Sequence, residues 1–413
     1  MNKMFSSNTL FLMGVNSIIG SGIFVLSGKL FIDAGSFSLV LIILAGLIST
    51  IIAFSYAQLA KIFPEGGGTW VYANKTFGNF WGFFAGAFDW LFGITTLAVE
   101  TKAMLLVAQM LWPNVNSSLL SISGMSLLLI LMIINLFGQS AVTWLDDLTS
   151  GLKITLIVVF VVIGLIFANW KNLNPISMHI FSNLGNLGNG FTSAFFLFAG
   201  FSFIPIHANQ LKNGANVIEK LILQVMAFVT LFFLLVQLAS ILLLDSNALN
   251  VNIPAAAELL KVGGIFARNL FLFGLLISIF GVVINASFNA PDVLTTLAAN
   301  HDVIPSTISK ENKFGSAVIP TLVTGFGSVL LLASNNYALL VSLTVLFSLM
   351  IYSVTVMSAI FNDKGERKLD RIVNLIAIPS LLILVISLTI QSIVIGIILF
   401  ALISGLYFYW SKA

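Results

Sequence analysis

The sequence predicts an all-α integral membrane protein with about 12 transmembrane helices, and two observations lead to that fold class. Hydrophobic residues make up 59% of the 413 positions and charged residues only 8%, against about 25% in soluble domains. Apolar stretches of about 20 residues, the length that spans a bilayer, recur along the chain. So few charges cannot cover a water-soluble surface, which excludes a soluble enzyme, a disordered chain and a nucleic-acid-binding protein.

Twelve apolar segments are expected to form the spans, and the joints at 334–336 and 390–391 are short enough to be hairpins. No segment outside the spans is long enough for a soluble domain, so we expect one transmembrane domain over residues 1–413. In chain order the segments cover 8–32, 37–60, 77–111, 119–138, 143–168, 189–208, 217–244, 264–290, 314–334, 336–361, 372–390 and 391–410.

The distribution of Lys and Arg predicts the orientation in the membrane. Twelve of them fall in segments on the side of the N-terminus, and four, Lys29, Lys171, Lys261 and Arg268, fall on the other side. Because cationic loops stay cytoplasmic, both termini are expected inside a cytoplasmic (plasma) membrane. The loop 139–147 does not fit this orientation: it is expected on the cytoplasmic side, but it carries two aspartates and no cation.

Metal and thiol chemistry is not expected. The chain has no cysteine and only three histidines, His179, His207 and His301, which are widely separated. Thiolate ligands are therefore excluded, the histidines indicate no metal centre, and no cofactor is predicted.

The first span contains a predicted break. Gly20-Ser21-Gly22 lies about ten residues into the segment, roughly 15 Å along a helix, which is the level of the bilayer midplane. Two glycines at that depth destabilise a continuous helix. The alternative is that they only allow close helix packing.

The sixth span contains a matching break. Gly200 is again about ten residues into its segment, and Pro205 follows where a second half-helix would begin. The sixth span enters the membrane from the opposite side to the first, because five spans separate their starts. Interrupted spans at matching positions of two inverted halves are typical of a transporter binding site.

The breaks also predict what is bound. The backbone N–H groups of Ser21, Gly22 and Ile23 would begin a half-helix and suit a carboxylate. Carbonyl groups around 16–19 and 198–200 would end the first halves and suit an ammonium group. A site with both suits an α-amino acid. The predicted substrate-binding residues are Ile19, Gly20, Ser21, Gly22, Ile23, Phe198, Ala199, Gly200, Phe201 and Ser202.

These segments resemble the amino acid–polyamine–organocation transporters. The stretch 14–24 (GVNSIIGSGIF) is similar to that family's first-span signature, 64–72 to its first cytoplasmic loop and 198–201 to its sixth-span break. The resemblance implies a LeuT-like five-plus-five inverted repeat plus two extra C-terminal helices. Repeat one would cover about 8–168, repeat two about 189–361 and the extra helices about 372–410.

The chain departs from the family pattern at three positions. Ser202 stands where many members carry Glu, the usual Asn-Pro after span 6 is absent, and Asp292 aligns with a usual basic residue. These departures weaken the assignment of any substrate from the resemblance, and that of a cationic substrate most.

Charged side chains inside the spans need a reason, because a charge near a helix centre costs about 2.5–3.5 kcal/mol. Lys153 lies about 9 Å into span 5, and the resemblance implies that its ammonium group stabilises the broken first span and carries a coupling proton. The alternative is a structural lysine. Glu100 and Lys102 are expected near the outer surface, and Asp89, which is deeper, could contact substrate or a neighbouring helix.

Three further polar residues are candidates for the pocket or for coupling. Asn16, Ser278 and Asn285 lie within spans, and each could equally form an interhelical hydrogen bond.

The sequence therefore predicts a secondary transporter that moves an α-amino acid, neutral by preference, by alternating access with proton symport or exchange. The expected partners are a small amino acid or amine, protons and the lipid bilayer, without nucleic acid. An amino acid–amine antiporter is the alternative within this class. A membrane-embedded enzyme or a channel is the alternative outside it, and no nucleophile–base pair or metal spacing favours an enzyme.

Overall fold

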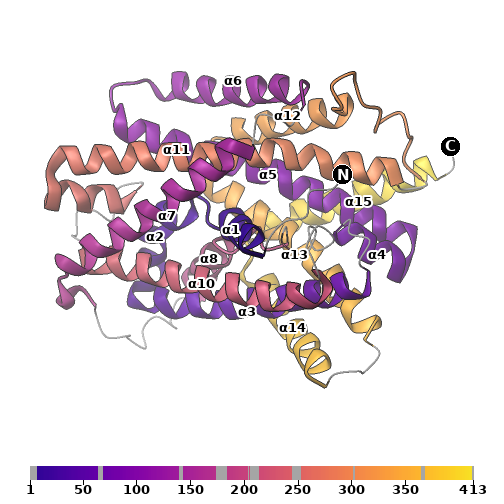
Figure 1. Ribbon diagram of the computed structural model, residues 1–413, viewed down its shortest axis with the longest axis horizontal. Helices are drawn as coiled ribbons and strands as arrows, with labels where there is room; N and C mark the ends of the chain where they lie inside the picture. Colours follow the sequence, from indigo (N-terminus) through magenta and orange to yellow (C-terminus); the bar gives the residue numbers. More distant parts are fainter. Residues whose placement is uncertain are drawn as a thin grey trace.

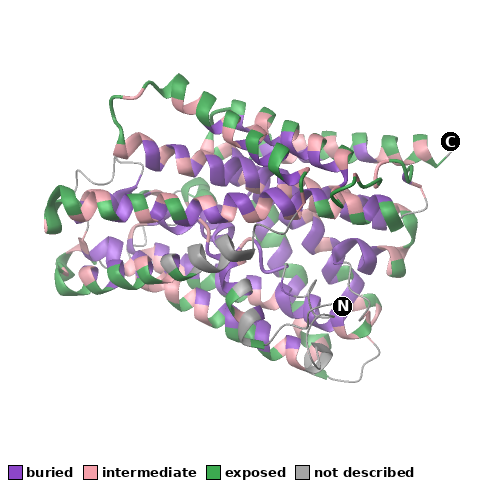
Figure 2. Cartoon of the chain, turned by 45° about the horizontal axis from the view of Figure 1, so that its top comes forward, coloured by how far each residue is buried: buried purple, intermediate pink, exposed green. Residues whose placement is uncertain are grey.

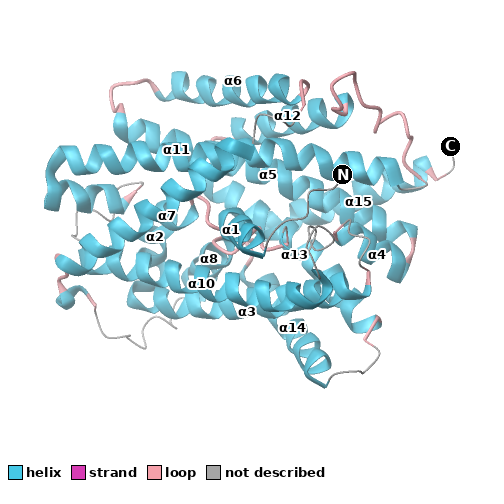
Figure 3. Ribbon diagram, in the orientation of Figure 1, coloured by secondary structure: helices cyan, strands magenta, loops and turns pink. Residues whose placement is uncertain are grey.

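The computed structural model is helical throughout the residues that it describes, which are 7–63, 68–138, 143–173, 184–202, 204, 214–243, 253–300, 303–363 and 368–411. Within these ranges no strand forms (Figure 3), and eight helices are long and apolar enough to cross a membrane. The all-helical membrane class is therefore confirmed, whereas twelve spans and an inverted repeat remain predictions.

The N-terminal half follows the apolar segments, with the first of them divided in two. Gly78 (φ 89°) separates a short helix, α4, from the long α5, in a backbone conformation that favours glycine. The helices are α1 (Ser7–Ile18), α2 (Gly22–Ala34), α3 (Ser38–Ile62), α4 (Thr69–Phe77), α5 (Asn79–Leu111), α6 (Ser117–Asn135) and α7 (Thr143–Ile166).

The C-terminal half also follows its segments, and both predicted hairpins are tight. Only three residues separate α12 from α13, and two separate α14 from α15. The helices are α8 (Leu184–Phe196), α10 (Gly214–Leu243), α11 (Pro254–Asn300), α12 (Val318–Ala333), α13 (Tyr337–Phe361), α14 (Lys368–Ser387) and α15 (Ile390–Trp410).

Burial divides the helices into an inner and an outer set (Figure 2). The most apolar 18-residue window of α13 is 78% buried, whereas those of α6 and α15 are 22% and 11% buried. Large apolar side chains such as Ile386 and Ile390 are more than four-fifths exposed. Such a surface suits lipid, because an exposed apolar patch of this extent is unfavourable in water.

The two interrupted segments lie in the middle of the molecule. In Figure 1 the short α1 and α8 are near the centre of the view, among long helices. Helix α1 packs against α10, α2 and α3 pack against α8, and α13 packs against both α5 and α8. The breaks are thus enclosed by protein, the setting in which non-helical backbone is tolerated at membrane depth.

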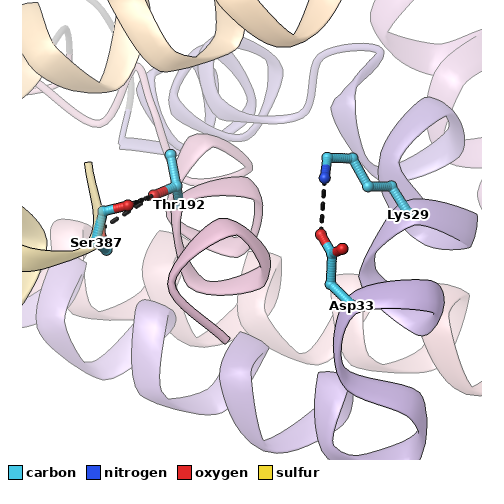
Figure 4. A network of polar contacts seen from close by, with 4 residues as sticks. All are labelled: Lys29, Asp33, Thr192 and Ser387. Carbon is cyan, nitrogen blue, oxygen red and sulfur yellow. Dashed lines mark hydrogen bonds and ion pairs between the residues drawn. The ribbon is translucent and has the colours of Figure 1, made fainter. Parts of the chain in front are cut away.

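Side-chain hydrogen bonds anchor the first half of the sixth segment. Thr192 of α8 donates to the carbonyl oxygen of Ser387 in α14 (2.8 Å) and lies 3.1 Å from its hydroxyl (Figure 4). Nearby, Lys29 and Asp33 form an ion pair of 2.8 Å along α2.

Candidate functional site

The first span is broken at the predicted glycines. Helix α1 ends at Ile18, and α2 begins at Gly22 after the N-cap residue Ser21, whose side chain makes no capping hydrogen bond. The amide of Ile19 still donates to the carbonyl of Val15 (2.9 Å). Beyond it, the N–H groups of Gly22 and Ile23 have no acceptor among the described residues. These two amides are buried donors at the start of a half-helix that begins inside the protein.

The sixth segment is broken as well. Helix α8 ends at Phe196, and a series of turns follows to residue 202. Gly200 has φ 109°, which favours glycine. Pro205, His207 and the predicted second half-helix lie outside the described residues.

The two breaks touch each other. The Ser17 hydroxyl donates to the carbonyl oxygen of Gly200 (3.3 Å) and to that of Gly14 (2.9 Å). A Cβ atom at Gly200 would overlap the Ser17 carbonyl oxygen. A glycine is therefore required here both by its backbone angle and by the approach of the first break.

A pocket opens where the breaks meet. About 480 Å³ of space between its lining residues holds no atoms, and part of this space is open to solvent. Both breaks contribute backbone to it, α5, α10, α11 and α13 contribute side chains, and it is mostly apolar, as small-molecule sites are. Its lining consists of Ser17, Ile18, Gly20, Gly22, Ile23, Phe92, Thr96, Glu100, Phe196, Leu197, Ala199, Gly200, Phe233, Val282 and Thr344.

The pocket brings together half of the predicted substrate-binding residues. Gly20, Gly22, Ile23, Ala199 and Gly200 line it. The other five do not line it: they are Ile19, Ser21, Phe198, Phe201 and Ser202, all buried beside the breaks.

The two phenylalanines in that second group pack against other helices. The Phe198 ring meets Phe233 of α10 edge to face, with ring centroids 5.2 Å apart. The Phe201 ring stacks on Tyr352 of α13 at 4.7 Å. In this structure neither ring lies across the pocket, where a gating residue would stand.

An aromatic cluster connects the sixth-segment break to α4. Phe201 stacks on Tyr352, both rings meet Tyr56 of α3 edge to face, and Tyr56 meets Tyr72 of α4 at 6.4 Å. All four side chains are fully buried. This aromatic cluster fills the space between the break and α4 with large rings.

The position of Glu100 differs most from the one that the sequence predicts. We expected it near the outer surface, but its side chain is only 4% exposed and lines the pocket. Its two carboxylate oxygens accept the backbone N–H of Ser21, at 3.1 and 3.3 Å. The expectation counted Glu100 along the long predicted span 77–111, which α5 matches closely. It was wrong because the packing of this helix against the first break brings Glu100 to Ser21.

Lys153 lies behind the first break. Its Nζ donates to the side-chain oxygen of Asn16 (2.6 Å) and approaches the Asn16 carbonyl oxygen (3.5 Å), and the lysine is 2% exposed. The ammonium group is thus bound to the last turn of α1, where helix carbonyls favour a cation. Two of the predicted coupling residues, Lys153 and Asn16, are direct partners.

The remaining candidates lie apart from the pocket lining. Asp89 of α5 is half-buried and lies close enough to Tyr56 and Tyr352 for its charge to act on them. Ser278 is buried in α11, and Asn285 accepts a hydrogen bond from Asn289 one turn further on. Lys102 bonds the side chain of Asn335 in the α12–α13 hairpin.

Sequence reasoning missed most of the side chains that shape the pocket. Phe92, Thr96, Phe196, Phe233, Val282 and Thr344 come from five helices, and Leu197 from the turn after α8, and these elements meet only in the folded protein. Among these side chains only Glu100 stood out in the sequence, because it is an acidic residue in an apolar helix and has no cation on the same face of that helix. Among the described residues no group of three acidic, histidine or cysteine side chains is placed to hold a metal ion.

Comparison with known proteins gives a consistent set of relatives. A family model described as amino acid permease matches residues 5–409. The chain is 24% identical to the serine/threonine exchanger of Bacillus subtilis, with 86% of this chain and 82% of the relative covered. It is 22% identical to the γ-aminobutyric acid permease of the same organism (90% and 81% covered). It is also 26% identical to a transporter of Mycobacterium tuberculosis (76% and 70% covered).

Proposed function

The chain belongs to the amino acid permease family and is a multi-pass membrane protein of amino acid transport, and from that premise we propose a mechanism and a substrate class. The protein is a secondary transporter that moves a neutral α-amino acid across the cytoplasmic membrane by alternating access. Transport is coupled to protons or proceeds by exchange. Both termini are cytoplasmic.

The observation that carries this proposal is the pocket between the two breaks. Gly22 and Ile23 line the pocket, and their amides are donors without acceptors among the described residues, which suits a carboxylate. Ala199 and Gly200 also line it, just after the end of α8, where helix carbonyl groups attract an ammonium group. These complementary ends support an α-amino acid as ligand.

Lys153 is proposed as the coupling residue. Its ammonium group lies against the last turn of α1, so it stabilises the break as a bound cation would. Lysine loses its proton more readily on burial than in water, which allows a proton to be exchanged during the transport cycle. Because this site already holds a cation, adding sodium at constant pH is not expected to accelerate uptake.

Alternating access requires one barrier to open while another closes. The aromatic cluster of Phe201, Tyr352, Tyr56 and Tyr72 supports a closed path between the pocket and α4 in this conformation. α4 belongs to the cytoplasmic side in the proposed orientation. Movement of the sixth-segment break, which carries Phe201, would separate these rings and open that path.

A neutral substrate is supported by the relative that exchanges serine and threonine and by the absence of acidic residues from 191–202. A second candidate, an amino acid–amine antiporter, is favoured by one observation. Glu100 places a carboxylate in the pocket lining, where it could meet the extra charge of a cationic substrate. We retain the neutral substrate because this carboxylate is already bonded to the Ser21 amide.

The test is a ligand screen followed by transport. Purified protein is heated with each of the twenty amino acids, γ-aminobutyric acid and simple amines, because a bound ligand raises the apparent melting temperature. Stabilising compounds are then assayed for uptake and counterflow in proteoliposomes. Saturable uptake of a neutral amino acid is expected. Uptake of cationic compounds alone would favour the antiporter, and no saturable uptake of any amino acid would contradict transport.

A further inference from the structure

A carboxylate of the protein already occupies the start of the second half-helix of the first span. Both carboxylate oxygens of Glu100 lie within 3.3 Å of the Ser21 amide nitrogen, one residue before α2 begins. This amide belongs to the same set of donors that would bind a substrate carboxylate. The protein's own carboxylate and the substrate's carboxylate are therefore directed to one small region.

The local structure is adapted to that carboxylate. A Cβ atom at Gly20 would overlap a Glu100 oxygen, so a glycine is needed for the close approach. The hydroxyl groups of Ser21 and Tyr337 are buried beside Glu100, close enough to interact with its carboxylate and with each other. Each hydroxyl can rotate to donate or to accept. The polar surroundings of the carboxylate are therefore not limited to the Ser21 amide.

Few other ionisable side chains lie close enough to Glu100 to interact with it. Lys153 of α7 acts on it electrostatically, and Tyr337 of α13 is the other titratable group that faces it. From α8, α10 and α11 the pocket receives apolar side chains, such as Phe196, Phe233 and Val282. Among the described residues that line the pocket, Glu100 is the only charged one.

A second carboxylate at the neighbouring amides would meet strong repulsion. Gly22 and Ile23 follow Ser21 directly, so a carboxylate bound to their N–H groups lies beside Glu100. Two carboxylates that share a site in a low-dielectric interior do not both stay ionised. One proton between them removes the repulsion and supplies an O–H donor.

We propose that Glu100 holds the anion position of the broken helix in the empty transporter and takes up one proton when the substrate carboxylate enters. The inference rests on the proposed function, since it assumes an amino acid in this pocket. The proton comes from solution and bonds to a Glu100 oxygen, whose O–H then donates to the substrate carboxylate. No other bond changes. Each amino acid therefore binds together with one proton.

The test compares Glu100→Gln with the wild type in the purified full-length protein. Glutamine keeps the shape of a protonated glutamate but cannot take up a proton. Glu258→Gln is the matched control, because Glu258 is 1% exposed in α11 and does not line the pocket. The probes are L-serine, L-alanine and the most stabilising amino acid of the screen, each paired with its decarboxylated amine, such as ethanolamine or ethylamine.

Calorimetric titration from pH 5 to 9 gives the dissociation constant and, in buffers of different ionisation enthalpy, the number of protons taken up. For the wild type and E258Q, the dissociation constant of the amino acid rises with pH, by up to about tenfold per unit for one linked proton. For E100Q it is constant, and no proton is taken up. At low pH the E100Q and wild-type proteins bind alike.

The amines distinguish this role of Glu100 from that of a simple counter-ion for the substrate's ammonium group. Without a carboxylate, they bind without proton uptake, and E100Q does not tighten their binding. Equal weakening of amino acid and amine binding in E100Q overturns this inference but not the proposed function. The same holds if the dissociation constant of E100Q depends on pH as steeply as that of the wild type. A wild-type protein that binds none of the amino acids overturns the proposed function as well. If E100Q does not fold, the proton count of the wild type decides, and zero protons contradicts the inference.

Discussion

At the scale of single residues, the buried pair of Lys153 and Asn16 explains how an interrupted helix is held in place. A lysine that is 2% exposed needs polar partners, because an isolated buried ammonium group is strongly unfavourable. The Asn16 oxygen at 2.6 Å supplies one partner, and the end of α1 supplies favourable carbonyl dipoles. The charge thus joins α7 to the first break.

Lys153→Ala is expected to give a folded protein with uptake reduced at least tenfold or uncoupled from protons. It removes a hydrogen bond to a charged group, worth about 1.5–3 kcal/mol, and frees the end of α1. Proteoliposome uptake with and without an imposed pH gradient is the measurement. Lys171→Ala, at an exposed lysine after α7, is the control. Normal proton-driven uptake in Lys153→Ala would contradict a coupling role.

The sequence alone indicated that Lys153 lies inside a span, but it did not indicate where Glu100 lies in the fold. Lys153 interrupts an apolar run close to the start of a span, so its burial follows from counting along one helix. The depth of Glu100 depends on how the 33-residue α5 is placed against the first break. That placement is a property of tertiary packing, which periodicity within one helix does not contain.

At the scale of elements, Gly200 controls how the two breaks fit together. Its φ of 109° permits the turn after α8, and its missing side chain admits the Ser17 carbonyl. Gly264, at the kink of α11, also has a positive φ (69°), but a Cβ atom there would meet nothing within 4 Å. The two glycines therefore share the backbone requirement and differ in packing.

Gly200→Ala is expected to lower the melting temperature more than Gly264→Ala and to reduce uptake at least tenfold. Both substitutions carry the cost of an unfavourable backbone angle, about 1–3 kcal/mol, but only Gly200→Ala also pushes the breaks apart. Thermal unfolding and uptake of the two variants are compared directly. Equal losses in both would mean that contact between the breaks contributes nothing.

The helices themselves were largely predictable, because long apolar segments and glycine interruptions are local signals. Helices α3, α6, α10, α13 and α15 lie within or close to their predicted segments. The separate helix α4 was not expected, because it lies before the predicted segment 77–111. Only the backbone angle at Gly78 separates it from α5.

At the scale of the whole molecule, the proposed orientation follows from cationic residues and is directly accessible to experiment. The chain contains no cysteine, so a single introduced cysteine reacts alone with a maleimide. Lys171 and Lys310 are both exposed and lie on opposite sides in the proposed topology.

A membrane-impermeant maleimide added to intact cells is expected to label Lys171→Cys and not Lys310→Cys. After the cells are broken, both variants should react, which controls for accessibility. The reverse pattern in intact cells would place both termini outside and contradict the topology.

The central claim is that the pocket between the breaks binds the transported amino acid, and one binding measurement tests it most directly. Val282 lines the pocket, whereas Val323 of α12 is 43% exposed on the apolar surface, so the same Val→Phe change can be made at both. An amino acid at 100 times its dissociation constant stabilises the wild type by about 2.7 kcal/mol. We expect this stabilisation to persist in Val323→Phe and to disappear in Val282→Phe, whose ligand-free melting temperature stays close to that of the wild type. Full ligand stabilisation of Val282→Phe would contradict the assignment of the site.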